Sequence, residues 1–122
     1  MTVDSGFYSI IDYPVDGPDV ARELVETFAE IQERWVRHHP GFRSARFLAS
    51  LDGARVIAIV HWASEAHLRM FEGSPETEGL GAAIRQALDG LPGVTEPRMD
   101  RFRVLREVPP DRWASSWPDP TG

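Results

Sequence analysis

The run of residues 56–60 most constrains the fold, because all five of its side chains are apolar. It lies within the segment Arg55–Trp62, which ends in a histidine and a tryptophan. A strand with one face on water alternates apolar and polar residues, whereas a strand that is apolar throughout is covered on both faces. We therefore expect residues 55–62 to form a central strand with protein against both of its faces.

Three further segments have the composition of strands, at residues 7–13, 42–50 and 98–108. Residues 42–50 are joined to the central strand by Leu51-Asp52-Gly53. Gly53 stands where a tight turn needs a residue in the left-handed conformation. These two strands are therefore expected to form a hairpin.

Helical periodicity marks the segment that starts at Pro18. The apolar residues follow one another at steps of four, four, three and four, which is one face of a 3.6-residue period. They are Val20, Leu24, Phe28, Ile31 and Trp35. Pro40 ends this helix near His38 or His39.

Two more helices are predicted after the hairpin. Ser64 is a suitable N-cap for residues 65–72, whose inward residues are Leu68 and Phe71. A second helix begins at Ser74-Pro75-Glu76 and ends at Gly90, which we expect to be left-handed. Its predicted buried residues are Leu80, Ala83, Ile84, Ala87 and Leu88.

The order of elements is therefore βαββαβ, which is typical of the α+β class and the ferredoxin-like fold, a four-stranded antiparallel sheet with helices on one face. Residue parity divides the central strand into a face with Val56, Ala58, Val60 and Trp62 and a face with Arg55, Ile57, Ile59 and His61. The helices cover one face only. A second copy of the chain is the simplest cover for the other, so we expect a homodimer.

Composition excludes several classes of function. The 122 residues include 19 acidic and 13 basic side chains, and the net charge of −6 argues against nucleic-acid binding. All basic residues are arginine, and cysteine and asparagine are absent, so a disulfide, a thiolate nucleophile and a Schiff-base lysine are excluded. No apolar run is long enough for a membrane span, and residues 1–6 lack signal-peptide features, so a cytoplasmic protein is expected.

The chain divides into a domain at residues 1–108 and a tail at residues 109–122. The tail holds four of the ten prolines and two of the four tryptophans, so regular structure is not expected there. We expect Trp113 and Trp117 to anchor the tail on a surface, and the partner subunit offers one.

Three short motifs lie at the start of the hairpin, at its turn, and between the hairpin and the helix that follows. They are Pro-Gly-Phe at residues 40–42, Leu-Asp-Gly at residues 51–53 and Trp-Ala-Ser-Glu-Ala at residues 62–66. This run resembles the antibiotic biosynthesis monooxygenase family, and the resemblance extends over about residues 5–108. It implies a dimeric α+β barrel made of two ferredoxin-like units. It also implies oxidation of aromatic polyketides by dioxygen without metal, flavin or haem, so no cofactor is expected.

The resemblance also suggests which residues form a site. It places Trp62 on the helix side of the sheet. The chemistry of the side chains then makes Trp62 the candidate stacking wall and hydrogen-bond donor, with His67 or Tyr8 as the candidate acid/base group. The expected walls of a pocket for a small aromatic substrate are Ala58, Val60, Trp35, Met70 and Phe71, although simple core packing explains the same spacing. The related oxygenases carry an asparagine at the position of Ala58.

That departure keeps three functions open: a cofactor-independent monooxygenase, a polyketide cyclase or isomerase, and a non-catalytic binding or assembly partner. No metal site is expected. The adjacent residues His38 and His39 are predicted to direct their rings apart, and the sequence shows no third ligand for them.

Overall fold

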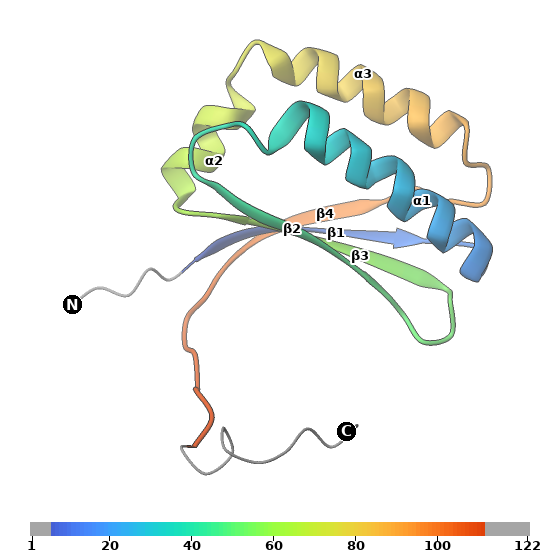
Figure 1. Cartoon of the computed structure of the whole chain (residues 1–122). Coiled ribbons are helices and arrows are strands. Elements are labelled where there is room, and N and C mark those ends of the chain that lie inside the picture. The colour runs from blue at the N-terminus through green and yellow to red at the C-terminus, as the bar shows by residue number, and fades with distance from the viewer. Residues whose placement is uncertain (1–5, 112–122) are drawn as a thin grey trace.

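The computed structural model describes residues 6–111, and the expected anchors Trp113 and Trp117 lie outside this range. The sheet has the strand order β2-β3-β1-β4, and each neighbouring pair is antiparallel. This arrangement confirms the predicted α+β, ferredoxin-like fold (Figure 1). The elements are β1 (Phe7–Pro14), α1 (Pro18–Ile31), the π-helical turn η1 (Gln32–Val36), β2 (Phe42–Ala49), β3 (Arg55–Trp62), α2 (Glu65–Glu72), α3 (Glu76–Asp89) and β4 (Arg98–Arg103).

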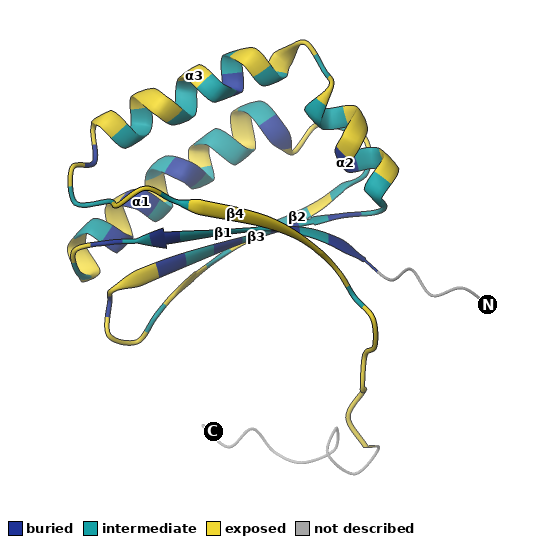
Figure 2. Cartoon of the chain, turned by 180° about the vertical axis from the view of Figure 1, so that it is seen from behind, coloured by how far each residue is buried: buried dark blue, intermediate teal, exposed yellow. Residues whose placement is uncertain are grey.

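The three α-helices lie on the same side of the sheet, and the curved opposite face carries no helix (Figures 1 and 2). The predicted parity of β3 is confirmed. Val56, Ala58, Val60 and Trp62 are buried beneath the helices, while Ile57, Ile59 and His61 on the open face are half-buried. Among the described residues, no helix combines the length and the apolar character that a bilayer crossing requires.

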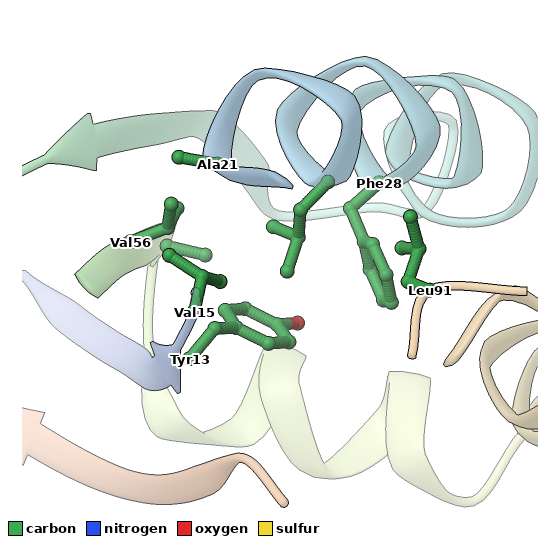
Figure 3. Close-up of a cluster of buried hydrophobic side chains, with 8 residues drawn as sticks. Tyr13, Val15, Ala21, Phe28, Val56 and Leu91 are labelled. Carbon is green, nitrogen blue, oxygen red and sulfur yellow. The ribbon is translucent and has the colours of Figure 1, made fainter. Parts of the chain in front are cut away.

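The core between sheet and helices consists of two clusters. The first gathers around Tyr13, whose ring lies against Phe28 with centroids 5.2 Å apart (Figure 3). Burial raises the pKa of the Tyr13 phenol, so this group stays neutral. The second cluster lies nearer the other end of the sheet and consists of Phe7, Val36, Val60, Trp62, Leu68 and Leu80.

The first helix departs from the predicted periodicity at its C-terminal end. The α-helix ends at Ile31 and continues as η1, whose wider turn holds an extra residue. The extra residue shifts the buried face by one position, so Val36 is buried and Trp35 only half-buried. Trp35 instead lies over Gly79 of α3, where a Cβ atom would come within 2.8 Å of the indole ring.

Three other predictions need correction. In α3 only Leu80 is fully buried, while Ala83, Ile84, Ala87 and Leu88 are half-buried at the edge of the core. Gly90 ends α3 with φ −84°, outside the left-handed region, whereas Gly53 has the predicted positive φ of 73°. The last strand ends at Arg103 and not at residue 108, because its partner β1 begins at Phe7, directly opposite Arg103.

Candidate functional site

Trp62 stands at the C-terminal end of β3 and is 1% exposed. Its ring is stacked on Phe71 of α2, with centroids 5.1 Å apart and planes 30° apart. Phe42 of β2 meets the indole edge-on at 5.8 Å. Strand register also pairs Trp62 with Phe7 of β1. The tryptophan is therefore enclosed by aromatic side chains from three different elements.

Three of the described polar side-chain atoms on this side of the sheet are buried without a hydrogen-bond partner: Nε2 of His39, the indole Nε1 of Trp62 and the amide Oε1 of Gln32, of which the last two concern the site around Trp62. Leaving a buried donor or acceptor unpaired costs about 1–3 kcal/mol, so native proteins rarely do so without a reason. Of these two atoms, one is a donor and the other is an acceptor. A ligand with a carbonyl oxygen and a hydroxyl group has the complementary groups.

A cavity of about 230 Å³ opens between the first helix and β2. Its lining includes Gln32 and Phe42, the residue whose ring meets the indole of Trp62 edge-on, but Trp62 itself does not line it. Typical ligand pockets have about 300–1,000 Å³, so a polycyclic ligand has to widen this cavity. The full lining is Ala29, Gln32, Glu33, Arg37, Phe42, Ala45 and Phe47.

Ala58 and Val60 are buried core residues of β3 next to this cavity. The register pairs Ala58 with Phe47 and Val60 with Ala45, both of which line the cavity, but neither Ala58 nor Val60 is itself a lining residue.

His67 lies in the first turn of α2 and is held by two contacts. Its Nδ1 lies 2.7 Å from the Oγ of Ser64, and the same oxygen caps α2 by accepting the His67 backbone N–H at 3.2 Å. The ring also packs on Gly41, where a Cβ atom would lie 2.2 Å from Cγ of His67. The Ser64 hydroxyl can donate to or accept from Nδ1, so this contact fits either tautomer of the His67 ring.

The side chain of Tyr8, the alternative acid/base candidate, lies on the face of the sheet opposite to that of Trp62. Antiparallel partners share a face, and Tyr8 is opposite His61, while Trp62 is opposite Phe7. The Tyr8 and His61 rings stack on the open face with centroids 4.5 Å apart. The sheet therefore separates Tyr8 from the cavity.

The remaining predicted walls are only partly brought together. Phe71 contacts Trp62 directly, and Trp35 packs against the same cluster from η1. Met70 is 63% exposed and lines none of the cavities described for residues 6–111. Its neighbour Phe71 takes the inward position because the two residues differ by about 100° around the helix axis.

A second cavity of about 390 Å³ lies between α2 and the edge of β1 and β4. Its charged groups pair with one another: Arg101 binds Glu72, and Arg69 binds Glu65 at 2.7 Å. Because these charges are already compensated, this cavity offers a weaker site for a small aromatic molecule than the one beside Phe42.

The geometry predicted for the adjacent histidines is also wrong. The rings of His38 and His39 are stacked, with centroids 4.7 Å apart, and both approach Glu76 at the start of α3. A third candidate ligand is therefore present. No sequence signal marks it, because Glu76 is 38 residues from His38. Gln32 was also missed, although its position four residues after Phe28 places it on the apolar face of the helix.

Comparison with known proteins agrees with this architecture. Residues 17–83, more than half of the chain, match the antibiotic biosynthesis monooxygenase family. The chain belongs to this family. Among curated proteins it is similar to the tetracenomycin-F1 monooxygenase of Streptomyces glaucescens, with 38% identity over 61 residues. That match covers 50% of this chain and spans about half (54%) of the relative.

Solved structures of the family superpose over most of the chain. The monooxygenase from the gene ActVA-Orf6 of Streptomyces coelicolor, in complex with nanaomycin D, is 33% identical and has a TM-score of 0.74. The match covers 88% of this chain and 95% of that one. The cofactor-independent oxygenase SnoaB of Streptomyces nogalater shares the fold at 18% identity, with a TM-score of 0.63 and coverage of 88% and 99%.

Proposed function

We propose that this protein is a cofactor-independent monooxygenase that acts on a small aromatic substrate of the polyketide type, in secondary metabolism. The observation that carries the proposal is the buried, unpaired indole N–H of Trp62 among aromatic rings. A flat substrate with an oxygen at its edge supplies both the stacking surface and the missing acceptor. Membership of the family, and the nanaomycin D complex of a relative, support this class of substrate.

The proposed reaction needs no external reductant. An anthrone-type CH₂ group is deprotonated to an electron-rich enolate, which gives one electron to O₂, and recombination forms a C–O bond to a hydroperoxide. Loss of water from the CH–OOH group then leaves a C=O group. One oxygen atom enters the product and the other leaves as water, so the substrate supplies all the electrons. The protein has to provide a dry cavity and donors for the developing negative charge.

In this proposal three residues share these tasks. Trp62 donates its N–H to the oxyanion or peroxide oxygen. Gln32 accepts a hydrogen bond from a substrate hydroxyl and orients the ring system. His67 takes the proton at Nε2, because Ser64 holds its other nitrogen. Tyr8 has no part in this site.

The working form in this proposal is a homodimer joined through the open face of the sheet. The centre of that face carries half-buried Ile57 and Ile59, and its edges carry exposed Leu48 and Phe102. No helix of the described residues covers it (Figure 2). Burying this face against a second copy removes apolar surface from water and covers the buried, unpaired Nε2 of His61.

A second candidate function, cyclisation or isomerisation of a reactive polyketide, is favoured by Ala58. This residue is 1% exposed on the helix face and brings no polar group to the position where related oxygenases carry an amide. Such a reaction needs a shaped cavity and one acid/base group.

Incubation of the protein with an anthrone under ¹⁸O₂ separates these functions. The monooxygenase should consume one O₂ per turnover and place one labelled oxygen in the quinone product and one in water. A cyclised product without mass from O₂ would replace the proposal by the second function. Binding of the anthrone without formation of any product would indicate that the protein binds the ligand but does not catalyse a reaction.

A further inference from the structure

The end of η1 and the start of α3 bring together three side chains that bind metals. Nε2 of His38 lies 3.3 Å from Oε1 of Glu76, and Nε2 of His39 lies 2.7 Å from the same oxygen. Each of the three residues offers one ligand atom, and these atoms all lie within 4.8 Å of one another. They are therefore close enough to hold one ion. In a tetrahedral zinc site with bonds of about 2.0–2.1 Å, ligand atoms are roughly 3.3 Å apart.

The present contacts do not satisfy this group. Nε2 of His39 is buried and approaches Oε1 of Glu76 at 2.7 Å without forming a hydrogen bond to it.

Access also suits a cation. The side chains of His38 and Glu76 are about half exposed, at 52% and 49%, whereas that of His39 is 13% exposed. An ion can therefore enter from solvent and meet one ligand that is already fixed.

We infer that His38, His39 and Glu76 form a binding site for a divalent transition-metal ion of the zinc type. Two imidazoles and one carboxylate suit zinc and its neighbours, whereas Mg²⁺ and Ca²⁺ prefer all-oxygen sets. Three protein ligands leave the fourth position to water. The site is separate from the proposed oxygenase cavity and supplies no step of that reaction.

The bound ion links two elements that are distant in sequence. It ties the end of η1 to the first turn of α3, and the ring of His39 already contacts Phe71 at 4.8 Å. Phe71 in turn stacks on Trp62. Metal binding should therefore stabilise the end of the core that contains Trp62.

Titration calorimetry of untagged, chelator-treated protein with ZnSO₄ tests the site. We expect one zinc ion per chain and a higher Tm with Zn²⁺ but not with Mg²⁺. His39→Ala and Glu76→Gln should each weaken zinc binding at least about 10-fold. Glu78→Gln is the matched control, because Glu78 is an exposed carboxylate of α3 outside the group, and it should keep the wild-type affinity.

His38→Ala, at a half-exposed position, serves as a third variant if either of the other two fails to fold by circular dichroism. Loss of affinity in this variant supports the site. The inference is overturned if the wild type binds no stoichiometric zinc, if the folded variants bind as well as the wild type, or if Mg²⁺ raises the Tm equally. In those cases the three side chains form only an ion pair between η1 and α3.

Discussion

Replacement of Trp62 by phenylalanine tests the proposed oxygenase most directly, because it keeps a flat aromatic ring and removes one N–H donor. That N–H has no partner in the folded protein, so no hydrogen bond within the protein is lost. We expect turnover of an anthrone to fall at least ~10-fold, because loss of one oxyanion donor typically costs about 10²–10³ in rate. Substrate affinity should change little, because the stacking surface remains.

The stability of this variant follows from two opposing effects. Phenylalanine is smaller than tryptophan by roughly 40 Å³, which at about 24 cal/mol per Å³ of cavity costs about 1 kcal/mol. Loss of roughly 35 Å² of buried apolar surface adds about 1 kcal/mol. Removing an unpaired buried donor stabilises the folded state by about 1–3 kcal/mol. The free energy of unfolding should therefore stay within about 1 kcal/mol of the wild type.

The assay combines an oxygen electrode with urea denaturation of the same preparations. Tyr13→Phe is the control, since it also removes one polar hydrogen from a buried ring, but in the other core cluster, against Phe28. It should keep wild-type turnover. If Trp62→Phe retains full turnover while folded, the indole N–H has no role in stabilising charge and the reasoning fails.

Three further perturbations probe the dimer, the hairpin and its turn. Ile59→Asp should convert a dimer to a monomer, because a buried unpaired charge costs several kcal/mol; light scattering checks this, and a wild type that runs as a 13.7 kDa monomer contradicts it. Gly53→Ala should destabilise by about 2–4 kcal/mol in urea, because φ is +73° and the new Cβ atom would lie 2.8 Å from Pro18. Hydrogen bonds from the Ala54 N–H and the Ser50 hydroxyl lower the pKa of Asp52, so its stabilising effect is present above its ordinary pKa and disappears as the pH falls through the lowered value. Asp52→Asn should remove this part of the acid dependence of Tm, and an unchanged profile would show that the turn contributes nothing.

Most elements of the fold could be predicted from patterns of residues that are close together in the sequence. Residues that face the core recur with the period of their helix or strand, so the sequence shows this pattern directly. Examples are the apolar run of β3 and the spacing from Val20 to Phe28. The hairpin at Gly53 and the cap at Ser64 involve neighbours within a few positions, so they too were predictable from sequence.

Predictions failed where contacts with residues distant in the sequence, and not the local pattern, determined the structure. The π-helical turn at Gln32 moved burial from Trp35 to Val36, which the regular α-helical period cannot indicate. The end of β4 was set by the first residue of β1, opposite Arg103.

The sequence by itself determined the element order and the two faces of the central strand, because both follow from residue periodicity. That the face with Trp62 lies beneath the helices was implied by the family resemblance and not by periodicity. Tertiary structure alone decided which side chains meet. The strand register places Tyr8 on the face of the sheet opposite to Trp62. The packing of α3 brings Glu76 next to His38 and His39. Such contacts depend on how separate elements pair and pack, and no periodicity within one element encodes that geometry.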